Sequence, residues 1–398
     1  CLVREQSDAS HWFDYGGFHM MTDDLLKAEE CFRQALSIQQ THTPSLLMSG
    51  VLSEMNGRYE DAETFFERAT SLEPNNVVAW TLFGVFYQVQ DKVIQAERAF
   101  REANKQLSSF LEKKLMPRAE HTSETQEEEQ KPGADADKDA QFQDEDTPQK
   151  TEKKKRLKPH SSASEVRAQT TIYLETVQFL LQSHALQMAQ RTLALELLSP
   201  DRGSLGSYHL ALARLQMLRG DLESTEDSLN QALIYDFQNP DIWALWGHLH
   251  HTRGDFSQAQ KCYERSLDSV LDASDLHHIY LRLGAIYLQG GEYQKARSVF
   301  LRACKRSPSC LAWLQLGISC YRLMELTEAE EALTEANALN NRNPEVWGYL
   351  SLICLRSGRK LEAEQSYKYA IKMKLQEESL LKEIHDLQSS VGFGNPSF

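Results

Sequence analysis

Apolar residues in the first 110 positions recur in two alternating stripes, and both stripes have helical spacing. Trp80, Phe83, Gly84 and Tyr87 lie three or four residues apart, as they would on one face of a helix. A short polar break, such as residues 56–58, separates each stripe from the next. The pattern therefore predicts an all-α chain built from pairs of antiparallel helices.

These helix pairs repeat at intervals of 34 residues, and five columns keep this step through three units. The columns are Gly16, Gly50 and Gly84; Ala28, Ala62 and Ala96; Phe32, Phe66 and Phe100; Ala35, Ala69 and Ala103; and Trp12, Leu46 and Trp80. The small residue of the first helix lets the second helix approach closely. The aromatic residue of the second helix then fills the space between neighbours.

The same columns return in the second half of the chain. The clearest units there carry Tyr280, Gly284, Ala296 and Phe300; Trp313, Gly317 and Ala329; Trp347, Ala363 and Tyr367; and Trp243, Gly247 and Tyr263. Two weaker units carry Leu212 with Leu229, and Leu180 with Ala189. We count three repeats over 9–110 and six over about 170–377.

This pattern resembles the tetratricopeptide repeat family, whose 34-residue unit has the same order of Trp, Leu, Gly, Tyr, Ala, Phe and Pro columns. The resemblance implies a superhelical α-solenoid of about nine helix-turn-helix units in two arrays. We predict an N-terminal array over 1–116, a linker over 117–164 and a C-terminal array over 165–376. Residues 377–398 then form an amphipathic capping helix and a flexible tail, because an open end would expose the core.

Residues 117–163 break the period and contain almost no aliphatic side chains. Such a segment cannot bury enough apolar surface to order itself, so it is predicted to be a disordered, charged linker. Its basic run at 153–158 leaves three interpretations open. The run is simply solvated, binds an acidic partner such as the tail of tubulin, or acts as a nuclear import signal.

The charge, apolar runs and cysteines of the chain restrict the kinds of partner and compartment that are expected. The chain has 43 Lys and Arg against 57 Asp and Glu, a net charge of −14. This balance disfavours nucleic acid and membrane as main partners, since both attract basic faces. No apolar run approaches the roughly 20 residues of a membrane helix. The chain starts at Cys1 with no signal pattern and is expected to be part of a longer protein. Its seven scattered cysteines, with no CxxC, favour a reducing compartment.

No motif of catalysis is found, neither a phosphate-binding glycine loop nor a nucleophile elbow nor a zinc-protease helix. We therefore predict a non-enzymatic protein with no catalytic residue, no cofactor and no metal. His248, His250 and His251 could suggest a metal site, but no acidic or cysteine ligand is near them in sequence. They are interpreted as polar residues on an exposed helix face, as are His277 and His278.

The inner groove of the superhelix is the predicted partner surface. In this fold, fixed positions of each first helix face that groove, and in the N-terminal array they are largely apolar. They are Phe13, Met20, Met21, Leu47, Val51, Met55, Val85 and Val89. So much apolar surface should be covered, either by a partner protein or by the chain itself.

The groove of the C-terminal array mixes basic, aromatic and apolar residues. Its predicted contact residues are Arg214, Tyr321, Arg322 and Arg356, beside aliphatic positions such as Leu314 and Leu352. This chemistry could accept an acidic amphipathic helix.

The three-plus-six arrangement around a charged insert, with the stretches 343–347 and 391–396, resembles a family of ciliary and flagellar repeat proteins. The resemblance implies a cytoplasmic, cytoskeletal component of the motile axoneme that supports dynein-driven beating. Its partners would be other axonemal proteins, such as dynein-arm or central-apparatus components, or tubulin. The alternative is a soluble adaptor in ciliary transport or another multiprotein complex. The oligomeric state is left open.

Overall fold

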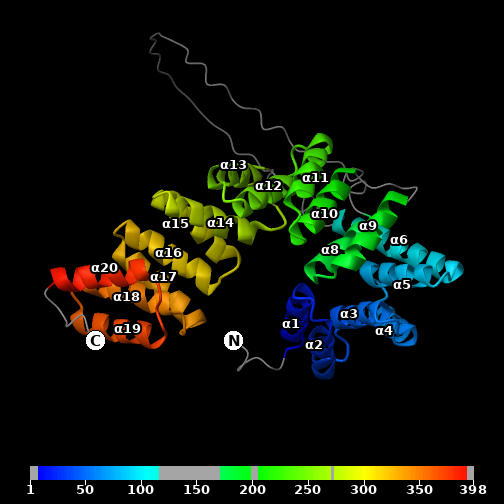
Figure 1. Cartoon of the computed structure of the whole chain (residues 1–398), viewed down its shortest axis with the longest axis horizontal. Helices are drawn as coiled ribbons and strands as arrows, with labels where there is room; N and C mark the ends of the chain where they lie inside the picture. Colours follow the sequence, from blue (N-terminus) through cyan, green and yellow to red (C-terminus); the bar gives the residue numbers. More distant parts are fainter. Residues whose placement is uncertain (1–7, 116–170, 199–204, 270–272, 392–398) are drawn as a thin grey trace, which may run out of the picture. The chain divides into compact units, whose positions relative to one another are not determined.

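The computed structural model describes residues 8–115, 171–198, 205–269 and 273–391, without the side chains of 113–115. Nineteen α-helices and no strand are found within these ranges (Figure 1), which confirms the all-α prediction. The chain divides into two compact units, residues 1–219 and 220–398. The predicted linker 117–164, its basic run and the tail after residue 391 lie outside the described residues.

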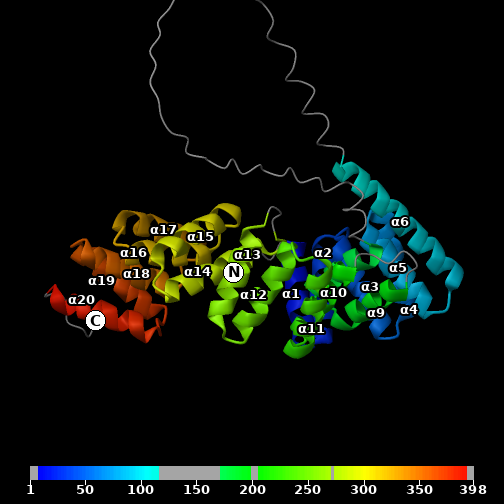
Figure 2. The ribbon, with the colours of Figure 1, turned by 90° about the horizontal axis from the view of Figure 1, so that it is seen from above.

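The first unit consists of helices that pair in the order of the chain. They are α1 (Ala9–Met21), α2 (Leu25–Ile38), α3 (Thr43–Met55), α4 (Tyr59–Leu72), α5 (Val77–Val89), α6 (Val93–Leu115), α8 (Ile172–Gln182), α9 (Leu186–Leu198) and α10 (Leu205–Leu218). Helix α6 is the longest of them, and Figure 2 shows it running past the end of α5. Its last turns pack Leu107 and Leu111 against Ile172 of α8.

The second unit continues the same plan and ends in an extra helix. Its helices are α11 (Leu222–Tyr235), α12 (Pro240–Thr252), α13 (Phe256–Leu267), α14 (Leu276–Gln289), α15 (Tyr293–Arg306), α16 (Cys310–Arg322), α17 (Leu326–Leu339), α18 (Pro344–Arg356), α19 (Lys360–Lys372) and α20 (Glu378–Ser390). Helix α20 lies where the sequence predicted a capping helix.

In several pairs, a glycine of the first helix packs against an aromatic ring of the second, as the repeat predicted. Gly50 of α3 faces Phe66 of α4, and a Cβ on Gly50 would lie 2.8 Å from that ring. The Cβ of a residue replacing Gly84 would likewise lie 2.6 Å from Phe100. A side chain at either position would force the two helices apart.

The tryptophan column has a second role that the sequence did not reveal. The indole Nε1 of Trp80 donates a hydrogen bond of 2.8 Å to the carbonyl oxygen of Pro74, six residues earlier. Trp243 and Trp347 make the equivalent bond, at 2.9 Å, to the carbonyl six residues before them. Each indole therefore fastens the turn that precedes its helix while its rings pack between helices.

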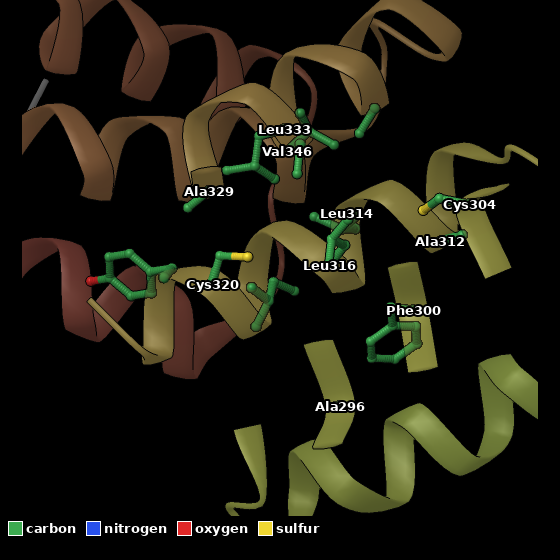
Figure 3. Close-up of a cluster of buried hydrophobic side chains, with 14 of the residues drawn as sticks. Ala296, Phe300, Cys304, Ala312, Leu314, Leu316, Cys320, Ala329, Leu333 and Val346 are labelled. Carbon is green, nitrogen blue, oxygen red and sulfur yellow. The ribbon is translucent and has the colours of Figure 1, made fainter. Parts of the chain in front are cut away.

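Each unit has its own hydrophobic core. In the second unit, residues of α12–α20 form one continuous cluster, and Figure 3 shows Phe300, Leu316 and Leu333 within it. In the first unit, the cluster joins α1–α6 with α8, α9 and part of α10. The compact unit thus extends across the insert, whereas the sequence analysis divided the two arrays there. None of the described helices is both long and apolar enough to cross a membrane.

Candidate functional site

A single carboxylate, that of Glu383 in α20, occupies the predicted groove of the second unit. Its Oε1 accepts a hydrogen bond of 2.8 Å from the hydroxyl of Tyr321. The Nη2 of Arg322 lies 2.9 Å from Oε2, and the Nη2 of Arg356 lies 3.4 Å from Oε1. The sequence predicted Tyr321, Arg322 and Arg356 as groove residues, and the structure brings these three together around one acidic side chain.

The repeat explains why two guanidinium groups meet at one point. Arg322 is the last residue of α16 and Arg356 is the last residue of α18, so the two are 34 positions apart and occupy the same column. Equivalent positions of successive repeats face the same side of the array. The last turn of a helix also favours a cation, because the unpaired carbonyl groups carry partial negative charge.

Tyr321 forms the floor of this site. Its side chain is fully buried, and the guanidinium of Arg356 lies 4.6 Å from the centre of its ring. A planar cation over an aromatic face is attracted by the negative face of the ring. Burial first, and then the nearby carboxylate of Glu383, raise the pKa of Tyr321, so its hydroxyl stays protonated and donates.

Helix α20 is also seated by apolar contacts. Leu380 and Ile384 are buried on either side of Glu383. Gly348 of α18 makes room for this contact, since a Cβ there would lie 2.8 Å from Leu380. On the next turn, the hydroxyl of Tyr367 is 3.0 Å from Nε2 of His385. We call the surface formed by Tyr321, Arg322, Arg356 and Gly348 the α20 slot.

Half of the residues predicted to line the apolar groove of the first unit are buried. Met20, Leu47, Val51 and Val85 are buried and belong to one cluster with residues of α8 and α9. These four side chains are therefore core rather than an open groove. Met21 and Val89 are exposed, while Phe13 and Met55 are partly buried. Arg214 is partly buried on α10, in the first unit.

An ion pair accompanies this covering of the first unit. Glu54 of α3 is buried, and its Oε1 lies 2.7 Å from Nη1 of Arg191 in α9. Burial raises the pKa of the Glu54 carboxyl, and the guanidinium opposes that rise. The pair joins residues 137 positions apart. Sequence reasoning missed it because neither residue stands in a repeat column.

The interpretation of His248 as an exposed polar residue is wrong. His248 is only 8% exposed, and its Nδ1 lies 2.8 Å from the hydroxyl of Tyr263 and 2.7 Å from Nη1 of Arg282. An arginine can only donate, so Nδ1 must accept and the ring is neutral. Burial accordingly lowers the pKa of His248, although Asp275 near its Nε2 opposes that shift. His278, by contrast, is exposed and pairs with Asp275.

Two family models and two curated relatives match this chain. The cilia and flagella-associated protein 70 C-terminal domain matches residues 243–392, and the middle TPR-like domain of the same family matches residues 1–108. The chain belongs to this family. The human protein named cilia- and flagella-associated protein 70 is 44% identical over the whole of this chain, and the Macaca fascicularis protein of that name is 43% identical. The chain spans 41% and 34% of the lengths of these two relatives.

Solved structures show a distant likeness to part of this chain. YrrB, described as a TPR protein with an unusual peptide-binding site, has 15% identity and a TM-score of 0.41 over 45% of this chain and 90% of its own. MamA from Desulfovibrio magneticus RS-1 has 17% identity and a TM-score of 0.39 over 44% of this chain and 98% of its own. Likenesses this distant carry no argument about function.

Proposed function

We propose that this chain is the repeat region of a non-enzymatic scaffold in the axoneme of motile cilia and flagella. The observation that carries the proposal is the 44% identity along the whole chain to a protein named for its association with cilia and flagella. The repeat fold supports an interaction role, since stacked helix pairs present extended surfaces to other proteins. On this proposal the scaffold supports dynein-driven beating, and its partners are dynein-arm or central-apparatus proteins.

The α20 slot and the basic run at 153–158 are the two charged features through which such partners would bind. The position of Glu383 of α20 between two arginines in the slot supports this proposal. The basic run has the charge to meet an acidic tail such as that of tubulin.

Fractionation of cilia tests the proposal. The full-length protein, tagged and expressed in ciliated cells that lack their own copy, should stay with detergent-extracted axonemes through a salt wash. Crosslinking followed by mass spectrometry should then identify axonemal neighbours. A Gly84→Leu variant, which pushes α5 from α6, serves as the control and should be lost from the axoneme. Recovery of the unmodified protein in the soluble matrix would overturn the scaffold proposal and favour a transport adaptor.

A further inference from the structure

Helix α20 makes one contact that its capping role does not require. To close the array, it needs only to cover apolar surface, and Leu380 and Ile384 do so. Glu383 adds a carboxylate that is held by three groups from α16 and α18. The contact with Tyr321 reaches across 62 positions of the chain. Helix α20 therefore has its carboxylate held as well as covering apolar surface.

We propose that the α20 slot binds an acidic amphipathic helix of another polypeptide, and that α20 is its built-in competitor. The partner helix would carry a glutamate with an aliphatic residue three positions before it and another directly after it. That is the pattern of Leu380, Glu383 and Ile384 in α20. The proposal does not depend on where in the cell the protein works.

The charged groups of the slot are carried by helices other than α20. Arg322 and Arg356 belong to the last turns of α16 and α18, and neither helix is built from α20. The Tyr321 ring is fixed from below by an edge contact with Tyr349, at 6.0 Å between ring centres. A vacated slot would therefore present two guanidinium groups and a hydroxyl with no carboxylate between them. Such a preorganised cationic site favours an anionic ligand, because little ordering remains to be done on binding.

The fit of α20 leaves room for a competitor. The Gln388 side chain is buried, and its Oε1 has no hydrogen-bond partner, which weakens the docked state. The arginine contacts are partly exposed and so are screened by water. Only residues 373–377 separate α20 from α19, and Lys374 among them adopts a positive φ of 64°. That short link gives α20 a high local concentration at the slot.

Peptide binding tests the proposal. The probe is a fluorescent peptide with the sequence of residues 377–391, titrated by anisotropy into the whole 398-residue chain. Glu383→Gln in the chain weakens the resident helix and leaves the slot intact, so this variant should bind the probe on the order of tenfold more tightly than the unmodified chain. Adding Arg356→Gln should remove that gain. Glu378→Gln, an exposed change on the same helix, is the matched control and should not alter binding.

Several results would overturn the proposal. The first is equal binding of the probe by the unmodified and Glu383→Gln chains, with circular dichroism showing both to be folded. Retention of the gain after Arg356→Gln would show that the slot does not read the carboxylate. Dimerisation of the Glu383→Gln chain in light scattering would assign the site to α20 of a second copy.

A second measurement covers the case in which Glu383→Gln fails to fold. A protease site inserted between residues 376 and 377, which are exposed, leaves the buried Leu375 in place and allows the link to be cut while α20 stays in place. After cleavage, the labelled peptide should exchange with α20 and the remaining helices should keep their circular dichroism. Unfolding of the cleaved array, or failure of the peptide to exchange, would show that α20 is part of the core and would refute the proposal.

Discussion

At the residue scale, adjacent glycines in α1 illustrate how strictly the repeat column is defined. Gly16 faces the ring of Phe32, so that a Cβ would collide with it, whereas nothing lies within 4 Å of the corresponding position on Gly17. The two residues share one helix and differ only in what they face. They are therefore a matched pair for measuring the column.

Gly16→Ala should destabilise the first unit by about 1–3 kcal/mol, since the ring of Phe32 must move out of its packed position. Gly17→Ala should instead stabilise it by roughly 0.5–1 kcal/mol, because alanine is the better helix former. Chemical denaturation of both variants gives the comparison. Equal midpoints for the two would mean that α1 and α2 do not pack through this column.

A second residue-scale prediction concerns pH. In the native state His248 is neutral, because its Nδ1 accepts from Arg282, and burial lowers its pKa below the ordinary value of 6.5. The unfolded chain therefore binds more protons, and the free energy of unfolding should fall as the pH drops below about 6.5. His42, His184, His209 and His251 have pKa values lowered by burial too and act in the same direction.

Thermal melts at several pH values between about 7.5 and about 5 would measure the effect. The His248→Gln variant should show a shallower loss of stability on acidification. An identical slope in the variant and the unmodified chain would show that His248 is not the group responsible.

At the element scale, the turn between the two helices of each unit carries a column that the sequence conceals. Asp23, Gly57 and Asp91 are 34 positions apart, and all three have positive φ values. Glycine takes this conformation freely, but other residues pay a steric cost. In units with glycine at this position, the sequence indicates the turn. In the turn between α16 and α17 the position is occupied by Met324, a residue type that does not indicate a turn.

Met324 has a φ of 65° and an exposed side chain. Comparing alanine with glycine at this position therefore measures the free-energy cost of the positive φ for a residue with a Cβ. Met324→Ala removes the side chain and its contact with Arg356 while retaining the strain. Met324→Gly removes both. The glycine variant should be about 1 kcal/mol more stable than the alanine variant. Differential scanning calorimetry of the pair decides the matter, and a more stable alanine variant would contradict the assigned turn conformation.

Elements also show where sequence reasoning stops. The 34-residue columns predicted the helix pairs and their close contacts, because those contacts are local and repeat. Leu47, Val51 and Val85 were predicted to line a groove, and they are buried. What covers them could not be read from the sequence, since periodicity marks an apolar face without naming its partner. The pairing of Glu383 with residues of α16 was hidden for the same reason.

At the scale of the whole molecule, one ion pair links the parts of the first unit that flank the insert. Arg191→Ala would leave the buried carboxylate of Glu54 without its cation. Arg191 is half exposed, so the expected cost is about 1–3 kcal/mol rather than that of a fully buried pair. The loss should shrink at lower pH, where Glu54 takes up a proton.

The double variant Glu54→Gln with Arg191→Ala should recover part of that stability, because no charge is then buried. Denaturant titrations of the single and double variants complete the cycle. Strict additivity of the two changes would show that α3 and α9 do not interact through this pair.

The shared core of α3, α5, α8 and α9 has a practical consequence for dissecting the protein. The insert looks like the obvious place to cut, yet a fragment that ended there would divide this cluster, and its counterpart would lack the α5 surface against which α8 packs. A nick in the insert should leave two pieces that copurify as one folded body. A fragment that folds by itself should instead run through the insert and end near residue 219.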